Sequence, residues 1–158
     1  MKKAISLLLA LVMSLALLTA CGGSAKKDVS VSDISAKVSD AIGKTDSLVA
    51  VDSNYIRGYM KVDAAQFGEY SMMINAYGAN IDEYGIFKAG DMSAKDIEAA
   101  VNAYLELRKA AWMDEYMPEE KPKLTNAEVR VSGDYVMYCI LSDDDKAAAF
   151  GAFEDALK

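Results

Sequence analysis

The stretch EVRVSGDYVMYCILS, residues 128–142, decides the fold of this 158-residue chain. Apolar and polar residues alternate over residues 128–132, as in a strand with one solvated face, whereas residues 135–141 are apolar almost throughout. Gly133 and Asp134 separate the two runs and suit a tight turn. We therefore predict a β-hairpin whose second strand is central in a sheet and buried on both of its faces.

A second hairpin is predicted upstream of the first. The segments EYSMMINA (residues 69–76) and NIDEYGIFK (residues 80–88) have strand-like composition, and Gly78 in the turn between them is free to adopt a positive φ. Between the two hairpins, apolar residues recur at helical spacing. They predict a long helix that is capped by Asp91 or Ser93, runs to about Tyr116 and is stopped by Pro118.

Helical patterns account for most of the remaining chain. Over Val29–Ile42 the apolar residues follow helical spacing, with Ser32 or Asp33 as the expected cap and Gly43 as the expected end. We further predict short helices over Ser47–Phe67, a polar connector over Pro118–Asn126 and a last helix over Asp143–Leu157. This order predicts an α+β fold, in which an antiparallel sheet of two β-hairpins separated by a long helix is covered by helices.

The N-terminal segment has the layout of an export signal. Lys2 and Lys3 precede an uncharged, leucine-rich stretch over residues 4–20, and Leu18-Thr19-Ala20-Cys21 is followed by Gly-Gly-Ser. These residues resemble a bacterial lipobox. The resemblance implies transfer of a diacylglyceryl group, with acyl chains such as palmitate, to the Cys21 thiol, followed by cleavage before it. The alternatives are an ordinary secretory signal with an incidental cysteine and an uncleaved signal anchor.

The lipobox divides the chain into three parts. We expect a lipoprotein signal peptide over residues 1–20, a flexible tether over residues 21–30 and a single α+β domain over residues 31–158. The expected location is the extracytoplasmic face of the cell membrane, to which the diacylglyceryl anchor holds the domain. Two acyl chains matter here because one chain alone binds a membrane only marginally.

Composition excludes several classes of function. Without Lys2 and Lys3 the chain has 15 basic and 24 acidic residues, a net charge of −9, which argues against nucleic acid as a partner. Histidine is absent, so neither a Ser-His-Asp triad nor a histidine-based zinc site is possible. Once Cys21 is acylated, Cys139 is the remaining cysteine, and its apolar surroundings favour a buried, unreactive thiol. We expect neither cofactor nor metal.

Two segments beyond the lipobox carry a resemblance to a known family. YGANIDEYGIFKAGD (residues 77–91) with its following helix, and LTNAEVRVSGDYVMYCILSDD (residues 124–144), resemble DUF4358, a family of small lipoproteins of clostridial-type Gram-positive bacteria. The resemblance extends over most of residues 30–158. The function of that family is unassigned, so the resemblance implies a fold and a location and supplies no catalytic residues.

Tyrosines are the best candidates for a binding surface. Of the nine in the chain, Tyr104 and Tyr138 are expected in the core, since both lie on predicted buried faces. Tyrosine combines a flat apolar ring with a polar tip, which suits recognition of sugars and proteins. We expect the ligand-binding residues at the surface to be Tyr55, Tyr59, Tyr77 and Tyr84.

Acidic residues offer competing interpretations. The run Asp143–Asp145 is a candidate calcium site, but it lacks the spacing of a calcium-binding loop and is better explained as the start of a helix. Glu69, Asp82 and Glu83 flank the first hairpin and make a carboxylate-dependent hydrolase of cell-wall glycan the alternative function. Arg57 and Arg108 are expected to form ion pairs, with an anionic ligand as the second option. Our prediction is a binding or interaction module at the cell envelope, not an enzyme, with an envelope protein or glycan as its partner.

Overall fold

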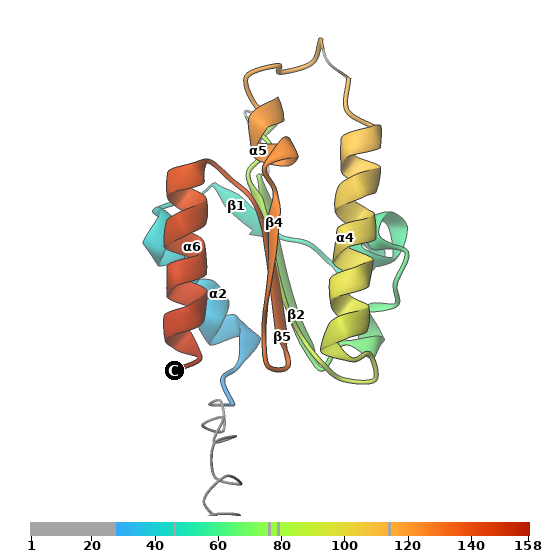
Figure 1. Cartoon of the computed structure of the whole chain (residues 1–158), viewed down its shortest axis with the longest axis vertical. Helices are drawn as coiled ribbons and strands as arrows, with labels where there is room; N and C mark the ends of the chain where they lie inside the picture. Colours follow the sequence, from blue (N-terminus) through green and yellow to red (C-terminus); the bar gives the residue numbers. More distant parts are fainter. Residues whose placement is uncertain (1–27, 46, 76, 79, 114) are drawn as a thin grey trace, which may run out of the picture.

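A single five-stranded antiparallel sheet forms the centre of the protein (Figure 1). The computed structural model describes residues 28–45, 47–75, 77–78, 80–113 and 115–158. The strand order is β1-β2-β3-β5-β4, so the two predicted hairpins, β2-β3 and β4-β5, join through pairing of β3 with β5. The predicted α+β fold is confirmed. The strands are β1 Leu48–Ala50, β2 Glu69–Asn75, β3 Glu83–Lys88, β4 Glu128–Ser132 and β5 Tyr135–Ile140.

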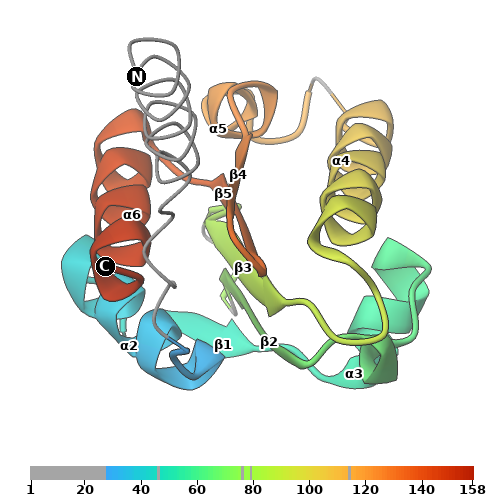
Figure 2. The same cartoon turned by 60° about the horizontal axis from the view of Figure 1, so that its bottom comes forward.

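Helices cover both faces of the sheet. Figure 2 shows α2 and α6 side by side on one face and α4 on the other. The short helical segments α3 and η1 lie on the α4 side, where η1 is a π-helical turn and η2 is a 3₁₀ turn. The bounds are α2 Val31–Ile42, α3 Ser53–Tyr55, η1 Ile56–Met60, η2 Ala64–Gln66, α4 Ala94–Ala110, α5 Lys121–Thr125 and α6 Asp143–Ala156.

Strand β5 contributes to both cores, as the sequence predicts. Its side chains alternate between the two faces, with Met137 and Cys139 packed beneath α2 and α6, and Val136 and Tyr138 packed beneath α4. All six of its residues are buried. Burial raises the pKa of the Cys139 thiol, which keeps the sulfur protonated and unreactive.

The ends of several elements differ from prediction. Helix α4 begins after Ser93, whose Oγ accepts from the Asp96 backbone N–H, but it ends at Ala110 rather than Tyr116. The backbone tightens there, since the Trp112 N–H donates to the carbonyl of Lys109. The cap of α2 is Ser30, not Ser32 or Asp33, and the polar connector contains the short helix α5. The edge strand β1 lies in the region predicted as short helices.

The sheet has two ends that differ in their surroundings. At the end we call proximal, Glu69 pairs with Lys88 and Lys88 with Tyr135. Asp28, the first described residue, forms a 2.7 Å ion pair with Lys88 there. At the opposite end, which we call distal, Ile74 pairs with Glu83 and Glu83 with Ile140. The C-terminus of α6 lies at the proximal end, near the start of α2 (Figure 1).

The last residues of the predicted tether contact the domain. The Val29 N–H donates to the Tyr135 hydroxyl at 3.0 Å, and Ser30 caps α2. The predicted signal peptide, Cys21 and most of the tether lie outside the described residues. Within the described residues no helix is long and apolar enough to cross a bilayer.

Candidate functional site

A pocket of about 180 Å³ opens at the distal end of the sheet. It forms where β2 ends and the chain returns into β3, and one wall comes from the C-terminal half of α4 and from α3. We call it the distal pocket. Its lining residues are Tyr55, Ile74, Asn75, Asn80, Ile81, Asp82, Glu83 and Arg108.

Glu83 and Arg108 form a buried ion pair at the base of the distal pocket. The Glu83 side chain is 2% exposed and accepts from the Tyr138 hydroxyl at 2.5 Å, the Tyr104 hydroxyl at 2.7 Å and Nη1 of Arg108 at 2.7 Å. A carboxylate out of water requires such partners, because desolvation of an unpaired charge costs several kcal/mol. The predicted ion pairing of Arg108 is confirmed.

The Glu83 network fixes the charge state of its members. Burial raises the pKa of Tyr104, and the neighbouring Glu83 carboxylate raises it further, so the tyrosine stays a hydrogen-bond donor. Burial alone would lower the pKa of Arg108, but attraction to Glu83 and the hydrogen bond to Tyr104 raise it. Arg108 is therefore a permanently charged guanidinium that a buried carboxylate holds in place.

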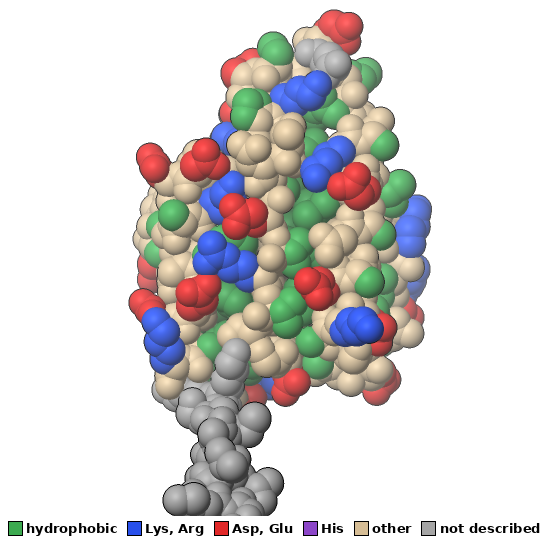
Figure 3. All heavy atoms as spheres, in the orientation of Figure 1, with side chains coloured by type: hydrophobic (Ala, Val, Ile, Leu, Met, Phe, Trp, Pro, Cys, Tyr) green, Lys and Arg blue, Asp and Glu red, His purple; other side chains and the backbone are tan. Residues whose placement is uncertain are grey.

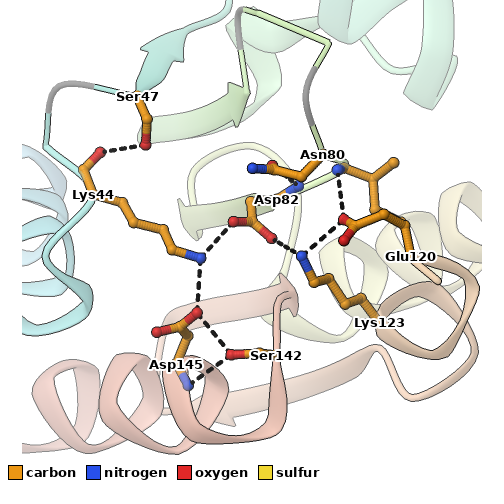
Figure 4. Close-up of polar contacts among 9 residues, drawn as sticks. Lys44, Ser47, Asn80, Asp82, Glu120, Lys123, Ser142 and Asp145 are labelled. Atoms are coloured by element: carbon orange, nitrogen blue, oxygen red, sulfur yellow. Dashed lines mark hydrogen bonds and ion pairs between the residues drawn. The ribbon is translucent and has the colours of Figure 1, made fainter. Parts of the chain in front are cut away.

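Asp82 organises a second network beside the pocket (Figure 4). Its buried carboxylate accepts from Nζ of both Lys44 and Lys123. Lys44 reaches on to Asp145 at 2.7 Å, and Lys123 to Glu120 at 2.7 Å. The network therefore ties the loop after α2, the helix α5 and the first turn of α6 to the strand β3.

Three of the four predicted surface tyrosines lie near the distal pocket. Tyr55 lines it and its ring centroid is 4.4 Å from that of Tyr59, which is 56% exposed. Tyr77 is 75% exposed in the turn that follows Asn75. The expectation for Tyr84 is wrong, because this side chain is 0% exposed beneath α2.

The two amide side chains that line the pocket were not predicted from the sequence, whereas Tyr55, Asp82, Glu83 and Arg108 were among the predicted candidates. Asn75 and Asn80 lie in and beside a predicted turn, where asparagine is common, so nothing marks them as functional. Arg108 offered one signal, since it falls on the stripe of the predicted helix that faces the core. A charged residue at such a position needs a buried partner, and that partner is Glu83.

The predicted acidic candidates do not form a common site. Glu69 lies at the proximal end, and the consecutive residues Asp82 and Glu83 project to opposite faces of the sheet, each toward its own cations. The run Asp143–Asp145 starts α6, as expected, and the Ser142 hydroxyl caps the helix. Across the described ranges, no three His, Cys, Asp or Glu side chains are grouped so that they could hold a metal ion.

Comparison with known proteins identifies the family. Residues 40–141 match the model of DUF4358, a domain of unknown function, and the chain belongs to that family. The match begins near the end of α2 and ends just after β5, a narrower range than the predicted resemblance. It includes every residue that lines the distal pocket. No curated protein and no solved structure matches the chain.

Proposed function

We propose that this protein is a lipid-anchored extracytoplasmic lipoprotein whose domain is a non-enzymatic binding module at the cell envelope. In this proposal the domain meets its partner, an envelope protein or glycan, at the distal end. The observation that carries the proposal is the position of the distal pocket, which opens at the end of the sheet opposite Asp28. Asp28 follows Cys21, the proposed site of lipid attachment, by seven residues.

The dimensions of the chain support this orientation. Seven residues span at most about 25 Å when fully extended, so the proposed anchor keeps Asp28 near the membrane surface. The strands between the proximal and distal ends have six to seven residues, equal to about 20 Å. A domain held through Asp28 therefore presents its distal end to the cell wall rather than to the bilayer.

The character of the distal surface also favours binding. Large apolar side chains are exposed near this end, among them Tyr77 in the hairpin turn and Met113 and Tyr116 after α4. Figure 3 shows hydrophobic side chains at the surface around the end of α4 and the segment beyond it. Aromatic residues and methionine are enriched where proteins meet partners.

Hydrolysis by paired carboxylates receives no comparable support. That chemistry requires two carboxyl groups that face each other across a substrate. Asp82 and Glu83 instead bind lysines on one side of the sheet and Arg108 on the other. We therefore propose a binding module rather than a hydrolase.

Site-specific photo-crosslinking in intact cells tests the proposal. A photoreactive amino acid at Tyr77 is expected to capture a reproducible envelope partner, whereas the same group at Lys158, which is exposed beside the proximal end, is not. Cys21→Ala should release the protein from the membrane or leave it unprocessed, and should abolish the crosslink. Equal capture at both positions, or a Cys21→Ala protein that is processed and membrane-bound as before, would contradict the proposal.

A further inference from the structure

The polar atoms that line the distal pocket divide into acceptors that are occupied and donors that are not. Asp82 and Glu83 already receive hydrogen bonds from lysine, arginine and tyrosine. The Oδ1 atom of Asn75 accepts from the Tyr77 backbone N–H at 3.0 Å, and that of Asn80 accepts from the Asp82 backbone N–H at 2.9 Å. The side chains of the pocket therefore have few acceptors left to offer a ligand.

Donors remain at three positions around the pocket. Both hydrogen bonds of Arg108 leave from Nη1, and its Nε and Nη2 have no acceptor among the described residues. Because the turn contacts fix the Oδ1 atoms of Asn75 and Asn80, the other atom of each amide is the donor Nδ2. Neither Nδ2 has an acceptor in the part of the chain that the structure describes.

We infer that the distal pocket binds a carboxylate group, with the Arg108 guanidinium and the side-chain amides of Asn75 and Asn80 as donors. The planar fork of a guanidinium matches the two oxygens of a carboxylate. This inference rests on the proposed binding function and names the class of ligand. The apolar side chains of Ile74 and Ile81, with the Tyr55 ring, form the wall against which the rest of the ligand packs.

Charge and size distinguish a carboxylate from other acceptor-rich groups. The Glu83 carboxylate already balances the charge of Arg108, and its repulsion of a doubly charged phosphate makes a single negative charge the better match for the pocket. A neutral sugar needs acceptors for its hydroxyl groups, and the side chains of the pocket have few acceptors left. A volume of about 180 Å³ suits an amino-acid-sized ligand or the terminus of a peptide.

Isothermal titration of the protein purified from membranes in detergent micelles tests the ligand class. The probes are N-acetylglycine and N-acetylglycinamide, which have the same size and differ in the charge of the terminal group. N-acetylglycine should bind at least about tenfold more tightly, since hydrogen bonds to a charged group are the stronger ones. Equal binding of the two probes, absence of binding, or tighter binding of inorganic phosphate would overturn the assignment.

Matched variants link the binding to these donors. Asn80→Asp retains the Oδ1 acceptor for the turn but replaces the free donor with a carboxylate oxygen, so N-acetylglycine affinity should fall about tenfold or more. Asn102→Asp makes the same change on the exposed face of α4 and should leave affinity unchanged. Arg108→Lys keeps a cation for Glu83 but removes the fork, and should weaken binding as Asn80→Asp does.

The result separates this inference from the proposed function. A crosslink at Tyr77 that persists while N-acetylglycine fails to bind would reject the carboxylate and leave the binding module in place. Binding that Asn80→Asp and Asn102→Asp weaken equally would place the carboxylate outside the distal pocket and reject the inference on its own. Thermal unfolding of each variant identifies any that is simply unfolded.

Discussion

Tyr84 shows how one buried hydroxyl connects a strand to a helix. Its hydroxyl is 2.8 Å from Oγ of Ser39 and 3.0 Å from Oγ of Ser35, and it donates to the Ser35 carbonyl at 3.1 Å. The two serines are four residues apart on α2, so they present one face to the tyrosine. Tyr84→Phe should therefore lower the free energy of unfolding by about 1–3 kcal/mol, measured by urea denaturation, because the buried Ser39 hydroxyl loses its partner while Ser35 keeps only its bond to Ser71.

Tyr77→Phe is the matched control for this prediction. It removes the same atom from a side chain that is exposed in the β2-β3 turn, and it should change the free energy of unfolding by less than about 0.5 kcal/mol. A loss for Tyr84→Phe as small as the one expected for Tyr77→Phe would show that the buried hydroxyl cluster contributes no stability.

Asp145 gives the network around Asp82 a dependence on pH. Burial alone would raise the pKa of this carboxyl, but hydrogen bonds from Lys44 and Ser142 outweigh burial and lower the pKa from its usual 3.8. A carboxyl with a lowered pKa in the folded state adds stability above its unfolded pKa, and this stability is lost as pH falls through the folded value. Asp145→Asn should thus be less stable than wild type at pH 6, and the difference should shrink below about pH 4.

Urea unfolding of both proteins at pH 6, 4 and 2.5 checks this pH dependence. Asp155→Asn is a useful comparison because Asp155 pairs with the exposed Lys158 outside the network. A stability difference between wild type and Asp145→Asn that stays constant over this range would mean that the carboxylate charge does not stabilise the fold.

Strand β3 has little room for a larger side chain at Gly85. A Cβ atom on Gly85 would meet the Tyr138 ring and lie 2.9 Å from Cε2 of Phe87, so glycine is required by the packing of the α4 side. Gly85→Ala should lower the free energy of unfolding by about 1–3 kcal/mol, the typical cost of overpacking a core. Urea denaturation measures this loss, provided that wild type and variant unfold with the same m-value.

Gly151 provides the opposite case on α6. A Cβ atom there meets nothing within 4 Å, so Gly151→Ala should raise stability by about 0.4–1 kcal/mol through helix propensity and the entropy of the unfolded chain. If Gly85→Ala were as well tolerated as Gly151→Ala, the result would contradict the close packing of Gly85 against the Tyr138 and Phe87 rings.

The elements predicted well from sequence are those with strong local signals. The hairpin β4-β5 has both alternation and a continuous apolar run, and α2 ends at Gly43 in the left-handed conformation, as predicted. Strand β1 has only three residues at the sheet edge, and it is held by pairing with β2 rather than by its own pattern. Helix α4 ends at Ala110 without a glycine or proline to mark the end. The apolar pattern continues to Trp112 although the hydrogen bonding has changed, so the sequence predicts a helix that is too long.

The candidate site was less predictable because it depends on tertiary contacts. The distal pocket combines residues from α3, the β2-β3 turn and α4, and no local pattern brings Tyr55 and Arg108 together with Asn80. Tyr84 was misassigned because the composition of the segment does not show which face of the sheet each position of β3 occupies. Its neighbours Glu83 and Gly85 face α4, whereas Tyr84 faces α2.

At the scale of the whole molecule, labels at the proximal and distal ends of the sheet can report how the domain is oriented on a membrane. Lys158 follows the end of α6 by two residues, and Ala156, the last residue of the helix, lines a hollow with Asp28 and Val29 at the proximal end. Tyr77 belongs to the turn at the distal end. The native Cys139 is buried, so a cysteine introduced at either surface position can be labelled selectively with a fluorescent maleimide.

With the proposed lipid anchor at Cys21, the protein should therefore stand on a bilayer with its proximal end down. Reconstituted into vesicles that contain a lipid with a headgroup quencher, a fluorophore at Lys158→Cys should be strongly quenched and one at Tyr77→Cys only weakly. The reason is geometric, since the strands between these ends are about 20 Å long and such quenching requires close contact. Equal quenching at the two positions would mean that the domain lies flat, and stronger quenching at Tyr77→Cys would place the distal pocket against the membrane, where a partner in the cell wall could not reach it.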